Sequence, residues 1–222
     1  MEDRTEQLRK IKDEIINAKN SPLYDFRIKN KFLPVIGEGN HYAKIMFIGE
    51  APGKNEALTG RPFCGAAGKI LDELLLSADI ARNEVYVTNI VKDRPPFNRD
   101  PEPQEIEFYA PFLDRQIEII KPEVIATLGR FSMDYIMKKF GLESEIKSIS
   151  QIHGKMFVVP VPILPFVETQ GQAEKLDEAS KTSSTSAPRQ IIPLYHPAVV
   201  IYNAREKETL KKDFEILKQF AK

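Results

Sequence analysis

The chain has 222 residues, of which 42% are hydrophobic and 29% are charged, and its 32 basic and 32 acidic side chains balance to zero net charge. This composition is typical of a soluble globular protein, and we expect a single domain over residues 1–222, monomeric and cytoplasmic, without a secretory signal or membrane contact. The balanced charge excludes a general electrostatic attraction to nucleic acid, so any such contact depends on a local basic patch.

The first half of the chain alternates predicted helices and strands. Apolar residues recur at helical spacing over residues 3–18, which predicts an amphipathic helix. The short apolar run at 43–48 is typical of a strand that is covered on both faces. Apolar side chains after Gly68 predict a second helix, and the β-branched residues at 84–91 predict a second strand.

The second half continues the alternation, and its elements follow in chain order. We expect a helix from Pro103 to before Pro122, a strand at 123–128, a helix at 131–140, extended pieces at 156–159 and 191–194, and a helix at 205–221. This order predicts an α/β fold with three layers, α/β/α, around a mainly parallel, four-stranded central sheet. Residues 170–188 are rich in serine and threonine, and we predict a mobile surface excursion there.

Unusual polar residues follow the predicted strands. Ligands of open parallel sheets bind beyond the carboxyl ends of the strands, where neighbouring loops face each other. Four predicted loops have this position, and they follow Ile48, Val91, Leu128 and Leu194. Glu50 lies in the first loop and His196 in the last, so we expect a carboxylate and an imidazole at one sheet edge. A solvated glutamate and a loop-capping histidine are the simpler alternatives.

Two further residues are placed where a ligand is expected. Phe63 lies in a loop between Pro62 and Cys64, where its ring is suited to stacking on a base or, alternatively, to core packing. Asn89 lies within an otherwise apolar strand, so its amide must be paired or directed at a ligand. An amide offers both a donor and an acceptor and is able to bind the edge of a pyrimidine.

Glycines are concentrated in the first of these loops. Five of the eleven glycines of the chain stand within twenty residues, at positions 49, 53, 60, 65 and 68. Such density indicates tight turns or close approach of the backbone to a ligand. The spacing matches neither the P-loop nor the dinucleotide-binding fingerprint, so a nucleotide cofactor is weakly supported.

Taken together, these segments resemble the uracil-DNA glycosylase superfamily, and most closely its family-four enzymes of bacteria and archaea. The resemblance covers nearly the whole chain outside the 170–188 excursion. It is carried by ordered motifs, namely GEAPG at 49–53, GRPFCGAAG at 60–68, TNIVK at 88–92, RPP at 94–96, NR at 98–99 and YHPA at 195–198.

The resemblance implies a base-excision DNA repair enzyme that hydrolyses the glycosidic bond of deoxyuridine in DNA and leaves an abasic site. A deoxyuridine would flip out of the duplex, its base would stack on Phe63, and Asn89 would bind its Watson–Crick edge. His196 would donate a hydrogen bond to the departing base, and Glu50 would position water and stabilise the charged sugar. Other pocket residues implied by the resemblance are Gly49, Ala51, Gly53 and Glu56.

Two groups of residues are candidate DNA contacts. The segment at 92–99 is a local basic patch with Lys92, Arg94 and Arg99, and solvated surface charges are the simpler alternative. The resemblance implies the second group. An apolar group would wedge into the space left by the extruded base, and it comprises Val199, Val200 and Ile201.

The chain departs from the family at the cluster-binding positions. Family-four enzymes usually hold an iron–sulfur cluster through four cysteines, whereas Cys64 is the only cysteine here. The corresponding positions are Ala18, Ser21, Asp93 and Tyr109. None of these residues supplies a thiolate, so we expect no iron–sulfur cluster, no other metal and no cofactor. A second departure is Ala57, where the family usually has an acidic residue, which makes discrimination against thymine less secure.

Two alternatives remain open at this point. The same fold with a different base preference would give a glycosylase for hypoxanthine, xanthine or another deaminated base. A chain that kept the pocket and lost turnover would be a non-catalytic module that binds damaged DNA, with an affinity sensitive to salt.

Overall fold

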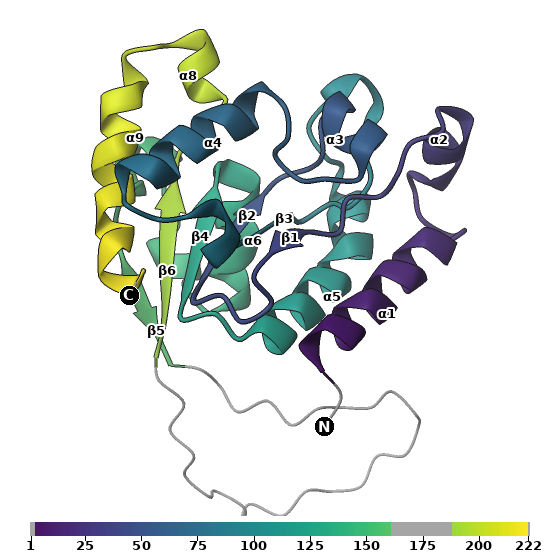
Figure 1. Ribbon diagram of the computed structural model, residues 1–222, viewed down its shortest axis with the longest axis horizontal. Coiled ribbons are helices and arrows are strands. Elements are labelled where there is room, and N and C mark those ends of the chain that lie inside the picture. The colour runs from purple at the N-terminus through teal and green to yellow at the C-terminus, as the bar shows by residue number, and fades with distance from the viewer. Residues whose placement is uncertain (1–2, 161–187, 222) are drawn as a thin grey trace, which may run out of the picture.

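The structure is a computed structural model that describes residues 3–160 and 188–221. Within these residues the strands form one six-stranded sheet in the order β1-β3-β2-β4-β6-β5 (Figure 1). The strands are β1 Glu38–Gly39, β2 Ile45–Gly49, β3 Tyr86–Asn89, β4 Val124–Leu128, β5 Phe157–Val159 and β6 Arg189–Leu194. The predicted excursion at 170–188 lies outside the described residues except for residue 188.

The four inner strands, β3, β2, β4 and β6, are parallel, as the alternation of helices and strands predicts. The expected strand number of four is too low, because the antiparallel strands β1 and β5 extend the sheet at its two edges. Strand β1 has two residues and gives no pattern in the sequence. Strand β5 was expected as an extended piece, but its pairing direction depends on contacts distant in sequence.

Helices cover both faces of the sheet, which confirms the three-layer α/β/α architecture (Figure 1). One face packs against α1, α5 and α6, and the other against α4 and α9. The longer helices are α1 Arg4–Asn17, α4 Ala66–Ser77, α5 Pro103–Ile120, α6 Arg130–Lys139 and α9 Glu206–Glu215. Each lies close to a helix that the apolar spacing predicts, and α9 continues as the 3-10 helix η4, Ile216–Phe220.

Strand β2 shows why two helical layers are needed. Successive side chains of a strand point to opposite faces, and all five residues of β2 are buried. Met46 and Ile48 belong to the core that includes α1, α5 and α6, whereas Ile45 and Phe47 belong to the core that includes α4 and α9. The almost wholly apolar sequence of this strand therefore follows from its cover on both sides.

Short helices and turns were not expected from the sequence. They are α2 Tyr24–Lys29, α3 Lys54–Thr59, α7 Ile149–Ile152, α8 Val199–Tyr202, η1 Arg82–Glu84, η2 Pro96–Asn98 and η3 Glu143–Glu145. Elements of three to six residues are too short for a helical period to be recognised. Helices α3 and α8 follow the loops after β2 and β6, so they shape the edge of the sheet that carries the predicted site. Among the described helices, none has the length and apolar character needed to cross a membrane.

Candidate active site

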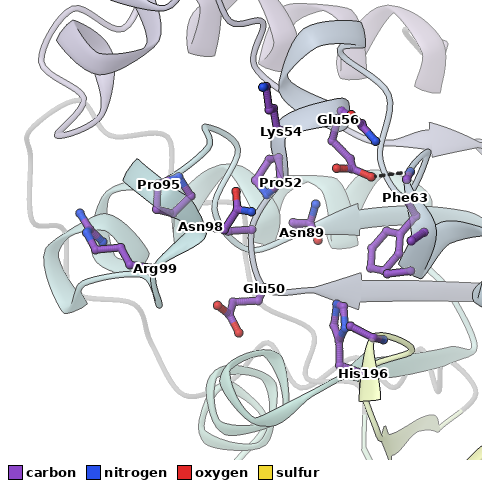
Figure 2. A pocket seen from close by; sticks show the side chains of 17 residues that line it. Glu50, Pro52, Lys54, Glu56, Phe63, Asn89, Pro95, Asn98, Arg99 and His196 are labelled. Atoms are coloured by element: carbon purple, nitrogen blue, oxygen red, sulfur yellow. Dashed lines mark hydrogen bonds between the residues drawn. The ribbon is translucent and has the colours of Figure 1, made fainter. Parts of the chain in front are cut away.

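A cavity of about 450 Å³ lies at the carboxyl ends of the inner strands. It is lined by residues of the loops after β2, β3 and β6 (Figure 2). Eight of the residues predicted for the site line it, namely Glu50, Ala51, Gly53, Glu56, Phe63, Asn89, Arg99 and His196. Segments distant in sequence therefore meet in one cavity, as the strand-end argument predicts.

Gly49 lies directly behind the cavity at the end of β2. It is paired in register with Asn89 at the end of the neighbouring strand β3. A Cβ atom at Gly49 would approach the Asn89 Oδ1 atom to 2.4 Å and the Phe63 Cζ atom to 2.7 Å. The absence of a side chain at Gly49 therefore lets the amide and the ring lie side by side at the base of the cavity.

The Asn89 side chain is 2% exposed and lines the cavity. Its carboxamide has no hydrogen-bond partner among residues 3–160 and 188–221, although burying an unpaired amide is unfavourable. Figure 2 shows Asn89 between Phe63 and Asn98, facing the interior of the cavity. Both the donor and the acceptor of this amide are therefore available to a ligand.

Phe63 is 8% exposed and packs in the core beside α4, which confirms the core-packing interpretation, and it also lines the cavity. Its backbone has a φ of +50°, a left-handed conformation that is unusual for an aromatic residue. Helix α4 approaches this loop so closely that a Cβ atom at Gly68 would meet the Phe63 carbonyl oxygen at 1.8 Å. The tight contact fixes one wall of the cavity.

The imidazole of His196 lies 5.7 Å from the Phe63 ring, measured between centroids. Its Nδ1 atom accepts a hydrogen bond of 3.1 Å from the backbone N–H of Ala198. Because an amide N–H only donates, Nδ1 carries no proton, and the neutral ring is protonated at Nε2. Burial lowers the pKa of His196 to about 4, and the nearby Glu56 opposes this shift. The ring is therefore neutral near pH 7 and has one N–H group to donate.

The position of His196 depends on the neighbouring strand. Gly129 follows β4 with a φ of +96°, and a Cβ atom there would lie 3.3 Å from the His196 Cβ atom. A residue with a side chain would be strained at this φ and would press on the histidine.

Glu50 lies at the end of β2, half-buried in the wall of the cavity. Burial raises the pKa of its carboxyl group to about 7, and the negative charge of Asp100 adds to the shift, whereas Arg130 opposes it. No hydrogen bond to this carboxyl group is present within the described residues. Glu50 therefore titrates near neutral pH.

Glu56 lies in α3 on the same side of the cavity as Phe63 (Figure 2). Its Oε1 atom accepts hydrogen bonds from the backbone N–H groups of Cys64 at 3.0 Å and Gly65 at 2.8 Å. The carboxylate thereby fixes the loop that carries the phenylalanine. Its Oε2 atom lies 2.7 Å from the position of a Cβ atom on Gly53, so this glycine also leaves room for the carboxylate.

The expectation that Lys92 contacts DNA is wrong. Its side chain is fully buried, and its Nζ atom donates to Thr88 Oγ1 at 2.8 Å, to the Asn89 carbonyl at 2.7 Å and to Gln116 Oε1 at 2.6 Å. Burial lowers the pKa of this amine well below its usual value. Lys92 therefore supports the strand end beneath Asn89 from inside the protein.

The two arginines of the predicted basic group lie at the rim. Arg99 lines the cavity, and its guanidinium pairs with the buried Glu105 at 2.6 Å. Arg94 does not line the cavity, and its Nε atom donates to Asn98 Oδ1 at 2.7 Å. Both remain partly exposed.

The three predicted apolar wedge residues lie on or at the start of α8, directly after the cavity-lining Ala198. Val199 and Val200 are half-buried against the core beside α4, and Ile201 is 51% exposed. A single turn of helix therefore presents the isoleucine more fully than the two valines.

Asp100 and Arg130 were missed by the sequence analysis. They form an ion pair beside the cavity, and both influence the pKa of Glu50. Arg130 begins α6, in the loop after β4 that the strand-end argument had already indicated as a possible ligand position. Asp100 ends the arginine-rich loop after β3. Exposed charges of this kind have no distinctive pattern in a sequence.

The positions that correspond to cluster cysteines do not fit an iron–sulfur cluster. The chain has one cysteine, Cys64, and it lies in the loop beside Glu56. The hydroxyl groups of Ser21 and Tyr109 and the carboxylate of Asp93 bond to one another. Within the described ranges no group of three or more His, Cys, Asp or Glu residues has the geometry for holding a metal ion.

The sheet and the cavity define an α/β protein with a pocket at the carboxyl ends of its parallel strands. The amide, the imidazole and the ionisable carboxyl group come from strand ends, and the aromatic ring comes from the loop between α3 and α4.

Comparisons with known proteins identify the family. A family model described as the uracil DNA glycosylase superfamily matches residues 36–218. The chain is 40% identical over 217 residues to a type-4 uracil-DNA glycosylase of Sulfurisphaera tokodaii, covering 97% of this chain and 86% of that protein. It is 40% identical over 210 residues to a type-4 enzyme of Archaeoglobus fulgidus, covering 95% and 91% of the two chains. A type-4 enzyme of Thermotoga maritima is 34% identical over 195 residues, or 87% of this chain and 85% of that one.

The chain therefore belongs to the uracil DNA glycosylase superfamily. This match confirms the resemblance that the sequence motifs indicate.

Proposed function

We propose that this chain is a monofunctional uracil-DNA glycosylase, which hydrolyses the bond between uracil and deoxyribose in DNA and leaves an abasic site. The observation that carries the proposal is the buried Asn89 carboxamide, which has no partner in the described protein and faces a cavity of about 450 Å³. Its family and its likeness to type-4 uracil-DNA glycosylases support the same conclusion.

Recognition of the base follows from the pairing of the ring and the amide. The uracil stacks on Phe63, while the Asn89 oxygen accepts the N3–H group and its NH₂ group donates to the O4 carbonyl. Cytosine presents an acceptor at N3 and a donor at N4, so both contacts would be lost. A buried site that makes hydrogen bonds discriminates strongly because a mismatched ligand leaves polar groups unpaired.

His196 assists the departure of the base. When the bond between C1′ and N1 breaks, its electron pair passes to the uracil, and negative charge develops on the O2 carbonyl. The Nε2–H of the neutral imidazole donates a hydrogen bond to this oxygen. A preorganised donor in a partly water-excluded cavity stabilises such developing charge more than bulk water does.

Glu50 completes the hydrolysis at the sugar. The ionised carboxylate stabilises positive charge on the deoxyribose and orients a water whose oxygen bonds to C1′. The proton released by this water passes to the carboxylate or to solvent. Because the pKa of Glu50 is about 7, the active ionised fraction increases as the pH rises through neutrality.

The remaining parts of the proposal concern the DNA and the assembly. Arg94 and Arg99 contact phosphates at the rim, and the residues at 199–201 fill the space vacated by the base. The enzyme acts as a monomer without a cluster, metal or other cofactor. In support of the absence of a cluster, the sequence lacks the thiolates that four cysteines would supply.

Base release from a defined oligonucleotide tests the function. Purified protein is incubated with a strand containing one uracil, and the strand is then cleaved with alkali at any abasic site. Parallel substrates contain hypoxanthine, xanthine or thymine at the same position. We expect cleavage of the uracil strand and release of free uracil. An intact uracil strand at high enzyme excess contradicts the proposal, and preferred cleavage of another substrate assigns a different base.

A further inference from the structure

Three of the four positions that the resemblance assigns to cluster cysteines, Ser21, Asp93 and Tyr109, form a buried polar network together with Arg27. The Ser21 and Tyr109 hydroxyl groups lie 2.6 Å apart, and the Tyr109 hydroxyl donates to Asp93 Oδ2 at 2.6 Å. The Arg27 guanidinium donates to both oxygens of Asp93, at 3.3 Å and 3.1 Å. Each of these four side chains is at most 7% exposed. The network therefore lies in the interior, where unpaired polar groups are strongly unfavourable.

The network joins three parts of the chain. Arg27 lies in α2 and also donates to the carbonyls of Ile15 at 3.1 Å and Ile16 at 2.8 Å, at the end of α1. Tyr109 lies in α5, and Asp93 lies in the loop after β3. The hydrogen bonds thus connect the N-terminal helices, the loop and α5, which are the segments that cysteines at these positions would connect.

The same loop forms part of the cavity. Pro95, Asn98 and Arg99 line it, and they follow Asp93 by two to six residues. At the far end of the loop, Arg99 pairs with Glu105 of α5 at 2.6 Å. The loop is therefore attached to α5 at both of its ends, and Asp93 is the attachment at the near end.

We propose that Arg27, Asp93, Tyr109 and Ser21 form a metal-free clamp that holds the loop of residues 93–99 in the geometry required for binding DNA. The clamp takes over the cross-linking that a cluster at these positions would provide, and this inference rests on the proposed function. Asp93, Arg27 and Tyr109 are positioning residues, because they act through the loop and do not line the cavity.

The clamp predicts a particular pattern of variant effects. Asp93→Asn leaves the buried Arg27 charge uncompensated, and we expect Tm to fall by about 10 °C. The double variant Asp93→Asn with Arg27→Gln removes both charges and recovers at least half of this loss. Tyr109→Phe removes one hydroxyl group, and we expect KM for a uracil oligonucleotide to rise about fivefold with little change in kcat.

An exposed pair provides a matched control. Glu14 and Arg115 also join α1 to α5, but their side chains are 46% and 45% exposed. Glu14→Gln is expected to change Tm by less than about 2 °C and to leave KM unchanged. The contrast separates the effect of the clamp from a general effect of joining these helices.

Iron provides an independent readout. Wild-type protein is incubated anaerobically with iron and sulfide, desalted and analysed for bound iron and for the visible absorption of a cluster. We expect neither, and we expect a chelator to leave Tm and KM unchanged. The proposal would be overturned by stoichiometric bound iron, by a lower Tm in the presence of the chelator, or by an unchanged KM in Tyr109→Phe. If the wild type releases no uracil, the proposed function fails, while the Tm coupling and the iron content still decide whether the clamp exists.

A second inference rests on a different observation, the exposure of Phe97. This side chain is 94% exposed, in the loop between the cavity-lining Pro95 and Asn98. Phe97 and Asn98 both have left-handed backbones, with φ values of +57° and +56°. A solvated ring on a disfavoured backbone gains nothing from folding, which points to a role in binding.

We infer that Phe97 stacks on a DNA base next to the extruded nucleotide. The arginines at 94 and 99 flank it and bring phosphates to the same loop, and Arg94 bonds to Asn98 Oδ1 at 2.7 Å, which braces the turn. Base stacking on exposed aromatic rings is favourable and tolerates any base. Phe97 thus contributes affinity for the strand without reading its sequence.

Phe97→Gly is the sharpest test, because glycine adopts the left-handed backbone without strain and removes only the ring. The measurement is the Kd for an abasic oligonucleotide by fluorescence anisotropy, which needs no turnover. We expect Kd to rise about tenfold, Phe97→Trp to restore it, and Tm to stay equal or increase. Leu76→Ala, at a residue 77% exposed near the end of α4, is the control and leaves Kd unchanged. Equal affinity of Phe97→Gly and wild type would overturn the inference.

Discussion

Two buried polar side chains three residues apart, Asn89 and Lys92, have opposite environments. The Asn89 carboxamide faces the cavity and has no partner in the described chain. The Lys92 amine is fully buried and donates to three oxygens within 2.8 Å. The comparison teaches that burial alone does not identify a functional group, because the satisfied Lys92 amine supports the fold, whereas the unsatisfied Asn89 amide lines a cavity and is available to a ligand.

His196 shows the same difference between the two nitrogens of one ring. Its Nδ1 atom accepts a hydrogen bond from the backbone, whereas its Nε2–H group is available to a ligand. His196→Ala is expected to lower kcat by about 10²–10³-fold, the usual cost of removing one donor to a developing anion. The measurement is single-turnover base release at saturating enzyme. A loss of activity that follows only from unfolding, seen by circular dichroism, would contradict the assigned role.

Glu50 is the unpartnered carboxyl group of the cavity, and its raised pKa makes the pH profile informative. In the wild type the rate is expected to rise with pH through about pH 7, because the ionised fraction grows there. Glu50→Gln is expected to reduce the rate about 10²-fold and to remove this rise. An unchanged profile in the variant would show that another group titrates.

The same shift has a consequence for stability. The folded-state pKa of Glu50 lies above its ordinary value, so between about pH 4.5 and 7 the folded protein binds more protons than the unfolded chain. The free energy of unfolding therefore falls as the pH rises through this window. Glu50→Gln is expected to gain in Tm relative to wild type at pH 8 but not at pH 4, as measured by thermal unfolding.

Replacing Asn89 and Lys92 in turn tests the contrast between the ligand-binding amide and the structural amine. Asn89→Ala is expected to lower kcat/KM by about 30- to 100-fold while the free energy of unfolding stays within about 1 kcal/mol. Lys92→Met leaves buried oxygens unpaired and is expected to lower the free energy of unfolding by about 1–3 kcal/mol, with activity retained below Tm. Urea unfolding measures the stability of the two variants, and base-release kinetics measure their activity. Equal effects of the two changes on activity would break the comparison.

A smaller effect is expected from Gly49→Ala. The added methyl group would overlap Asn89 Oδ1 at 2.4 Å, so the amide and the Phe63 ring must shift. We expect about a tenfold loss in kcat/KM, because misplacing a positioned group is costly. Steady-state kinetics on a uracil oligonucleotide measure it, with Gly141→Ala as a control, since a Cβ at that glycine would have no neighbour within 4 Å. Gly141→Ala also strains the backbone, because φ at Gly141 is +72°, whereas Gly49→Ala does not. The Tm of both variants is therefore compared with that of the wild type.

The smallest effect is expected at the exposed rim. Arg94→Gln is expected to weaken binding to uracil DNA a few-fold and to reduce the slope of log K against log salt by about one. Titrations at several salt concentrations measure the slope. A change in base preference without a change in slope would contradict a phosphate contact.

Much of this architecture was accessible from the sequence because it depends on periodic apolar patterns. The runs that became β2, β4 and the helices α1 and α5 are long or apolar enough to be recognised alone. The gathering of Glu50, Asn89 and His196 followed from the rule that parallel strands end at one edge. Strand β1 and helix α8 were missed because two to four residues carry no period.

The environment of individual polar residues was less accessible. Lys92 stands beside arginines in a basic segment, and only the fold places its amine among Thr88, Gln116 and the Asn89 carbonyl. The ion pair of Asp100 and Arg130 depends on two loops meeting in space. Side chains whose role is set by long-range neighbours leave no signal in a local pattern.

The central claim is that the Asn89 amide has no partner within the described protein because its hydrogen bonds are made to uracil. The most direct measurement is the rate of base release from otherwise identical strands that contain uracil, cytosine or hypoxanthine, for wild type and Asn89→Ala. The wild type is predicted to act on uracil far faster than on the other two bases, and the variant is predicted to lose most of that preference. A variant that keeps both the rate and the preference would contradict the claim.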